Sequence, residues 1–185
     1  MLVVEDEPEL LEIYSGWLED RYEVRSAASA QTAYHLMDDS VDVVLLDRMM
    51  PEISGDQVLA EFREAGYECK VAMVTAVKPD IDVADLGFDD YVQKPVTEGG
   101  LNEVVERLLH RRSYNEQVQE YFAVISKLVA LDQADGDLSG TDRYRELVDR
   151  KETLRRELDS TSRTFDREDF EATMRDFGEL GVWAE

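Results

Sequence analysis

The sequence has little of what secreted or membrane proteins are built from. Its 185 residues include one cysteine, Cys69, so no disulfide can form within the chain. No apolar run approaches the roughly 20 residues that cross a bilayer. The first residues lack the basic start and apolar middle of a signal peptide. These absences predict a soluble, cytoplasmic protein without a membrane partner.

Positive charge is also scarce. The chain has 43 acidic and 20 basic residues, for a net charge of -23. Nucleic acids and anionic lipids both attract cationic surfaces, so this balance argues against binding either. Halophilic proteins tolerate such acidity because concentrated salt screens the self-repulsion, and in a halophile the charge says less about partners. Since 43% of the residues are hydrophobic, the chain should fold around a core.

Proline and glycine are spread unevenly, which indicates two modules. All four prolines precede residue 96, and residues 101–135 contain neither proline nor glycine. We therefore predict a first domain over residues 1–112 and a helical second domain over residues 113–185.

The first module alternates short β-rich runs with helical patterns. Five strands are predicted, at residues 2–4, 22–24, 41–46, 71–74 and 91–92. Helices are expected between the strands, and Ser54 stands where one of them needs an N-cap. The third and fourth runs are apolar on both faces, which is typical of central parallel strands. The predicted fold class is α/β, with a doubly wound, five-stranded parallel sheet.

The second module shows a heptad pattern that predicts one helix from about residue 101 to about residue 131. Its apolar seam is interrupted only at Arg111 and Asn115, and consists of Leu101, Val104, Leu108, Val118, Phe122, Ile125 and Val129. A second helix from about Thr141 should fold back antiparallel, giving an all-α hairpin or coiled-coil module. A short final helix is expected near Phe170. The seam favours a homodimer or docking on a helix of another protein.

Residues with reactive side chains follow the predicted strands. Glu5 and Asp6 come after the first strand and Asp47 after the third, while Thr75 and Lys94 come after the fourth and fifth. In a doubly wound sheet, ligands bind outside the carboxyl ends of the strands. We therefore expect three acids, one hydroxyl and one ammonium group to converge at one edge.

Closely packed carboxylates repel one another, and each takes up a proton unless a cation separates them. Mg²⁺ fits, because it prefers octahedral oxygen ligands such as these acids and a backbone carbonyl just past Asp47. Asp47 can then attack a phosphoryl group in line while the metal and Lys94 neutralise charge. Thr75 can hydrogen-bond the phosphoryl oxygen, and Tyr91 can fill the space that Thr75 leaves, which makes a two-state switch.

Four runs of sequence carry a resemblance to a known family. They are VVEDEP at residues 3–8, LLDRMMP at 45–51, VTA at 74–76 and GFDDYVQKP at 87–95. In order, spacing and strand position they resemble the CheY-like receiver domain of two-component response regulators, over about residues 1–112. The resemblance implies a flavodoxin-like sheet and a phosphoacceptor switch rather than an enzyme, with self-catalysed, Mg²⁺-dependent phosphorylation and dephosphorylation.

The resemblance also implies roles for individual residues. Asp47 accepts phosphate from a sensor histidine kinase, and Mg²⁺ is held by Glu5, Asp6, Asp47 and the backbone carbonyl of Met49. Thr75, Tyr91 and Lys94 transmit the change, and the Lys94–Pro95 bond is expected to be cis. One departure is Glu5, which stands where many family members have aspartate.

The second module resembles the HalX domain of haloarchaeal response regulators, which is presumed to be regulatory. An alternative is a transcriptional regulator that binds DNA through these helices, using the basic residues near 143–156. Residues 113–185 hold 10 basic and 18 acidic residues, so DNA binding is possible but not favoured over a protein partner.

Overall fold

The computed structural model describes residues 1–78, 86–133 and 139–162. The chain divides into two compact units, Met1–Leu109 and His110–Glu185. The final helix that the sequence predicts near Phe170 lies outside the described residues. In the part of the chain that is described, no helix has the length and apolar character that a bilayer crossing requires.

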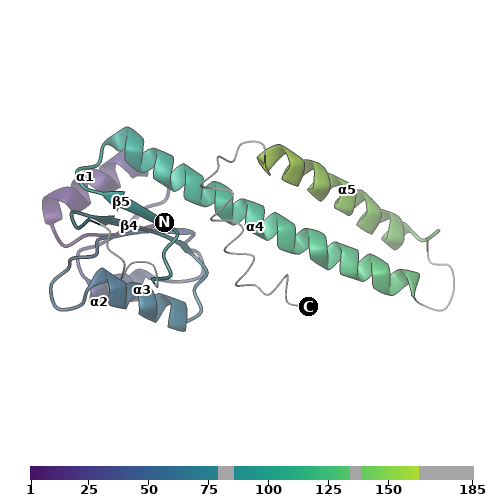
Figure 1. Cartoon of the computed structure of the whole chain (residues 1–185), viewed down its shortest axis with the longest axis horizontal. Helices are drawn as coiled ribbons and strands as arrows, with labels where there is room; N and C mark the ends of the chain where they lie inside the picture. The colour runs from purple at the N-terminus through teal and green to yellow at the C-terminus, as the bar shows by residue number, and fades with distance from the viewer. Residues whose placement is uncertain (79–85, 134–138, 163–185) are drawn as a thin grey trace. The chain divides into compact units, whose positions relative to one another are not determined.

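The first unit is built on one parallel sheet (Figure 1). Its elements in chain order are β1 (Leu2–Val4), α1 (Pro8–Glu19), β2 (Arg25–Ala27), α2 (Ala30–Leu36), β3 (Val43–Leu46), α3 (Gly55–Glu64), β4 (Lys70–Thr75), β5 (Asp90–Gln93) and the first part of α4 (Glu98–Asp132). The strand order is β2-β1-β3-β4-β5, and every neighbouring pair is parallel. The predicted five-stranded, doubly wound α/β fold is confirmed.

Helices cover both faces of this sheet, with α2 and α3 on one side and α1 with the start of α4 on the other (Figure 1). Alternate strand residues point to opposite faces. Val4 and Leu46 pack in the core under α2 and α3. Val3 and Leu45 pack in the second core, under α1 and α4. Every residue of β3 and β4 is buried, as expected of central parallel strands.

The position of the second strand differs from its prediction. Residues 22–24 were expected to form it, but β2 begins at Arg25, which pairs with Leu2 of β1. The amide of Tyr22 instead donates to the Leu18 carbonyl at 2.9 Å, which closes the end of α1. Tyr22 and Val24 still pack against the core under α1 and α4. The alternating apolar side chains of Tyr22 and Val24 thus resemble a strand in the sequence, although these residues lie just before the hydrogen-bonded part of the sheet.

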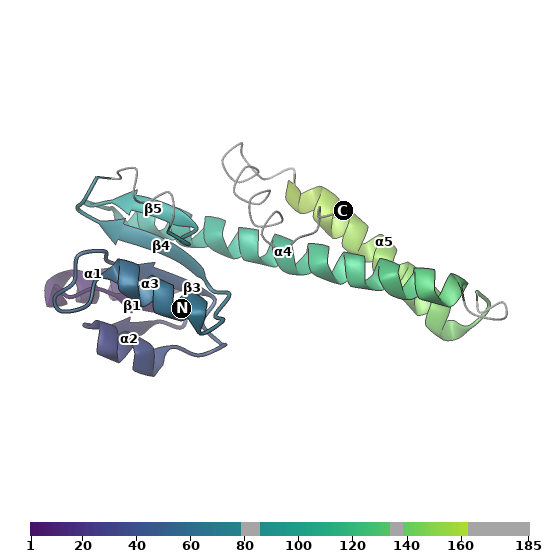
Figure 2. The same ribbon diagram turned by 60° about the horizontal axis from the view of Figure 1, so that its bottom comes forward.

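The second unit is an antiparallel helical hairpin, made by the rest of α4 and by α5 (Asp142–Ser162), as predicted. Figures 1 and 2 both show α5 running alongside α4. Arg150 Nε donates to Glu120 Oε1 at 2.7 Å, and the Tyr144 hydroxyl donates to Asp132 Oδ1 at 2.9 Å. These two contacts fix the antiparallel register along the hairpin.

The stripe of α4 that α5 covers is different from the seam of the heptad, which was expected to pair with another chain. The buried hairpin core consists of Val124, Leu128 and Leu154. Phe122 and Val129, assigned to the seam from sequence, are 45% and 48% exposed. Helix α4 carries two apolar stripes here, and α5 packs on the one that the heptad assignment passed over.

Candidate functional site

The acidic residues gather at the carboxyl ends of β1 and β3, which are neighbours at the centre of the sheet. Glu5 and Asp6 follow β1, and Asp47 follows β3. Their carboxylate oxygens lie within 4.8 Å of one another. Glu5 and Asp47 are buried, at 1% and 5% exposed, while Asp6 is half-buried. In doubly wound folds, ligands bind at the position where crossovers leave in opposite directions on the two sides, and the acidic residues lie at this position.

Lys94, just after β5, reaches across to two of these acids. Its Nζ lies 2.6 Å from Asp47 Oδ2 and 2.7 Å from Glu5 Oε2. The Lys94–Pro95 peptide bond is cis, as the resemblance implied. The structure thus brings together the three acids and the ammonium group that the sequence placed at one edge.

The buried charges alter the ionisation of this cluster. Burial raises the pKa of Glu5, and the hydrogen bond from Lys94 opposes this rise without cancelling it. For Lys94, burial is the largest single influence and acts to lower the pKa, but the hydrogen bonds and the charge attraction to Asp47 and Glu5 together outweigh burial and raise the pKa. Lys94 is therefore held as a cation between two carboxylates.

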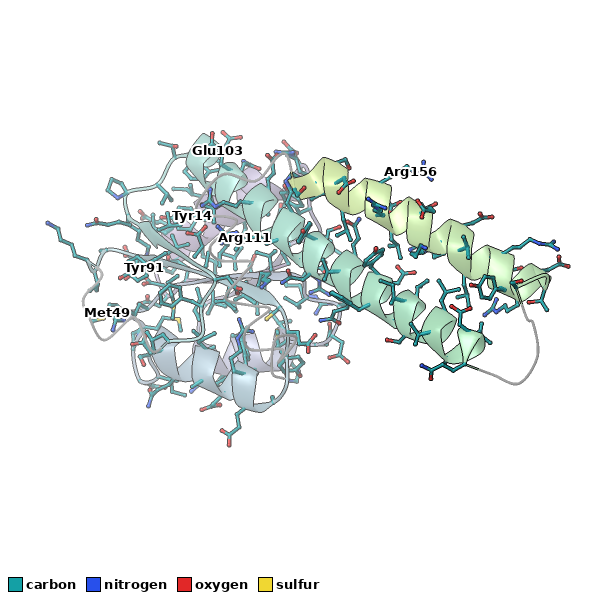
Figure 3. All side chains as sticks on the ribbon, turned by 45° about the vertical axis from the view of Figure 1, so that its right-hand side comes forward. Tyr14, Met49, Tyr91, Glu103, Arg111 and Arg156 are labelled. Carbon is teal, nitrogen blue, oxygen red and sulfur yellow. The ribbon has the colours of Figure 1, made fainter. Side chains whose placement is uncertain are left out.

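The backbone after β3 also holds Asp47. The Met49 amide donates to Asp47 Oδ1 at 3.1 Å, so the two carboxylate oxygens have different partners. The Met49 side chain lies at the surface of the unit and is 65% exposed (Figure 3).

These residues fit a hard divalent cation. All three carboxylates offer oxygen ligands, and Lys94 offsets only part of their negative charge. Within the described residues this is the one group of three or more metal-binding side chains close enough to share an ion. A Mg²⁺ ion at this position would supply charge neutralisation for an incoming phosphoryl group.

Thr75 and Tyr91 are connected through a residue that the sequence did not single out. The Val77 amide donates to Thr75 Oγ1 at 3.3 Å, and the Tyr91 hydroxyl donates to the Val77 carbonyl at 2.9 Å. Thr75 is fully buried, while Tyr91 is half-buried and packs against Phe88. Nothing in the local pattern marks Val77, because it contributes only backbone atoms.

Gly55 is a second residue that sequence reasoning missed. It opens α3, directly after Ser54, which caps the helix as the sequence predicted and also forms a capping box with Gln57. The Gly55 amide donates to the Arg48 carbonyl at 2.9 Å. A Cβ atom at Gly55 would lie 2.2 Å from the Asp47 carbonyl oxygen. The absent side chain lets α3 begin against the backbone that carries Asp47.

Comparison with known families agrees with this geometry. Residues 1–106 match the response regulator receiver domain family, and residues 110–174 match the HalX domain family. The chain therefore belongs to the response regulators and carries a receiver domain followed by a HalX domain.

Similar proteins include a protein of Haloferax volcanii named as a transcriptional regulator, 44% identical over 165 residues. That match covers 88% of this chain but 28% of the relative. The transcriptional regulatory protein CpxR of Escherichia coli is 34% identical over 123 residues, covering 64% of this chain and 53% of CpxR. The chain thus spans about half or less of the length of these relatives.

Solved structures resemble the receiver part. The BeF3-activated DrrB receiver domain has a TM-score of 0.54 and 29% identity, covering 58% of this chain and 94% of that one. A response regulator receiver domain protein from Clostridium thermocellum has a TM-score of 0.55 and 31% identity, covering 60% and 94%. The TrrA protein of Thermotoga maritima, solved in complex with Mg²⁺ and BeF, has a TM-score of 0.50 and 32% identity, covering 58% and 96%.

Proposed function

We propose that the chain is a phosphorylation-controlled switch in which Asp47 accepts a phosphoryl group from a sensor histidine kinase. The observation that carries this proposal is the buried Asp47 carboxylate, set among Glu5 and Asp6 and contacted at 2.6 Å by Lys94. A buried carboxylate between a cation and a metal-binding cluster is oriented for attack on phosphorus.

In the proposed reaction, an Asp47 oxygen forms a bond to phosphorus as the bond from phosphorus to the kinase imidazole breaks, and the imidazole leaves with its electron pair. Glu5, Asp6, Asp47 and the Met49 carbonyl are the ligands expected to hold Mg²⁺ at this edge. Lys94 stays close to the new acyl phosphate and offsets its negative charge. Water later attacks phosphorus, the bond from phosphorus to the Asp47 oxygen breaks, and inorganic phosphate leaves as the carboxylate is restored. The same residues of the chain assist this second step.

The hydrogen bonds around Val77 support a route for the response. If Thr75 Oγ1 turns to donate to a phosphoryl oxygen, the Val77 amide loses its acceptor. The Val77 carbonyl is in turn the acceptor for Tyr91. A change at Thr75 therefore reaches Tyr91 through one residue of backbone, and both can take a second arrangement.

The output is proposed to pass through the HalX helices by protein contact. Direct DNA binding is the second candidate, and it draws on the names of the Haloferax volcanii and CpxR relatives. Against it, three of the five arginines of α5 are paired with acids: Arg143 with Glu146, Arg145 with Asp142 and Arg150 with Glu120. A mobility-shift assay in molar KCl, with a chain ending at Leu109 as control, separates the two candidates. A shift that needs the helices would favour DNA binding.

Phosphorylation is tested by incubating the chain with acetyl phosphate and Mg²⁺ and measuring its intact mass. We expect the mass of one added phosphoryl group, located on Asp47 by peptide mapping, and none in Asp47→Asn. Asp56→Asn is the matched control, since Asp56 pairs with Arg48 outside the acidic cluster. Absence of any added mass on the native chain, or an equal gain in Asp47→Asn, would overturn the proposal.

A further inference from the structure

Helix α4 presents an exposed apolar strip that α5 does not cover. The strip consists of Val118, Phe122, Ile125 and Val129. Phe122 and Val129 are 45% and 48% exposed, and Val118 and Ile125 are half-buried. Among the described residues only four large hydrophobic side chains are exposed, and two of them lie seven positions apart on this strip. Seven residues are close to two helical turns, so they share one face.

The strip is also free of charge, although 34% of the chain's residues are charged. At about 100° per residue, Glu116, Glu120 and Lys127 fall on the opposite side of α4 from the strip. Glu120 is engaged there by Arg150 of α5. Gln119 and Ser126 lie on α4 directly beside the strip, along one of its edges, and both are uncharged. For two copies of a chain with net charge -23, an uncharged surface is where close contact meets the least repulsion.

The angle between the two stripes of α4 indicates what kind of assembly covers the strip. Tyr121, Val124 and Leu128 face α5. By helical periodicity the centre of the strip lies about 100° away from the centre of that stripe. Neighbours of a helix are separated by about 90° in a four-helix bundle and by about 60° in a three-helix bundle. The angle of about 100° is therefore closer to that of two hairpins packed as a four-helix bundle than to that of one hairpin with a third helix added.

The sizes of the side chains along the strip are nearly the same when the strip is read from either end. Valine stands at both ends, with Phe122 and Ile125 between them. When two strips run antiparallel, Val118 lies opposite Val129 of the other copy and Phe122 lies opposite Ile125. Each layer then contains side chains of similar volume, whereas a parallel arrangement places two phenylalanines across one layer. A two-fold contact of this kind is self-complementary.

We propose that the strip is a dimerisation surface, and that two chains join through antiparallel contact of Val118, Phe122, Ile125 and Val129 to form a four-helix bundle. Such a dimer is one structural form of the proposed output through protein contact, and its role in signalling rests on that proposed function. Because net repulsion opposes the contact, the dimer should tighten as KCl is raised.

The test uses the full, unphosphorylated chain in molar KCl, so its outcome is independent of phosphorylation at Asp47. Light scattering with size exclusion should show a dimer. The double variant F122E/V129E should weaken it by at least about thirtyfold in Kd. The control A123E/A130E adds the same charges at exposed neighbouring positions away from the strip and should leave the dimer intact. Far-UV circular dichroism of both variants establishes that the helices are formed.

Two further measurements decide what covers the strip and whether the two copies of α4 run antiparallel. If the full chain is monomeric and a chain ending at Ser162 dimerises, residues 163–185 cover the strip and the proposal is wrong. In a Cys69→Ser background, a mixture of V118C and V129C chains should form a mixed disulfide dimer, while V118C alone should not. Cross-linking of V118C with itself would overturn the antiparallel arrangement, and equal dimerisation by F122E/V129E would overturn the surface.

Discussion

Lys94 Nζ lies 2.6 Å from Asp47 Oδ2, although β4 separates the strands that precede these two residues. The lysine side chain is 10% exposed and that of the aspartate 7%, so this is a buried ion pair. Lys94 also contacts Glu5, the second buried acid of the cluster. One cation thus stabilises two carboxylates that would otherwise face each other in a site of low polarity.

Replacing this cation should destabilise the receiver domain. We expect Lys94→Met to lower the free energy of unfolding by about 3 kcal/mol at neutral pH without Mg²⁺, because Asp47 and Glu5 lose their shared partner. Urea unfolding at fixed KCl concentration measures the loss, and added Mg²⁺ should recover part of it. Lys127→Met is the control, since Lys127 is exposed on α4. Equal losses in the two variants would contradict the role given to Lys94.

Asp6 is the most accessible member of the acidic cluster and should contribute strongly to Mg²⁺ affinity. We expect Asp6→Asn to weaken Mg²⁺ binding by at least about tenfold, because the site loses one of three anionic ligands. Isothermal titration calorimetry at constant KCl provides the measurement. Glu7→Gln removes the same charge from an exposed neighbour outside the cluster and should change the affinity little. A tenfold effect from Glu7→Gln as well would indicate general attraction by the acidic surface.

The sheet and the cluster of reactive residues could be predicted because strands that alternate with helices run parallel, and parallel strands have all their carboxyl ends at one edge. Asp47 and Lys94 could be assigned to that edge from sequence alone. That Lys94 reaches both Asp47 and Glu5 could not, since this depends on side-chain paths across three strands. Val77 carried no signal either, because its part in the site uses only its amide and carbonyl groups.

The second module shows a different limit of prediction from sequence. A heptad spacing identified the helix, but α4 has apolar residues on two stripes, and spacing along one helix does not determine which stripe a neighbour covers. Val124 and Leu128 contact α5, whereas Phe122 and Val129 do not become buried. The choice depends on α5, whose Leu154 fills the space between the helices. Pairing of helices is thus a property of two surfaces together.

The hydrogen bond between Val77 and Thr75 predicts that acceptance of phosphate and the response to it can be separated. We expect Thr75→Val to bind beryllofluoride at Asp47 while losing the change in hydrogen exchange at residues 76–78 and 90–93. Valine has the shape of threonine but no hydroxyl to donate to the added group. Thr75→Ser should restore the response. An unchanged exchange response in Thr75→Val would show that the hydroxyl is not needed.

Replacing Gly55 or Gly16 with alanine should change the free energy of unfolding in opposite directions. In Gly55→Ala the new Cβ would lie 2.2 Å from the Asp47 carbonyl oxygen and 2.9 Å from Arg48 Cα. Backbone atoms cannot turn aside, so α3 or the loop carrying Asp47 must shift, and we expect a loss of about 2 kcal/mol or more in unfolding free energy.

Gly16 lies inside α1 and is exposed, and nothing stands within 4 Å of a Cβ built there. Gly16→Ala should therefore raise the free energy of unfolding by about 0.5–1 kcal/mol, because alanine loses less backbone entropy on forming a helix. Urea denaturation of both variants gives the comparison, and the rate of labelling by acetyl phosphate should fall only in Gly55→Ala. If Gly55→Ala were as stable and as quickly labelled as the native chain, the close approach of α3 to Asp47 would not be required.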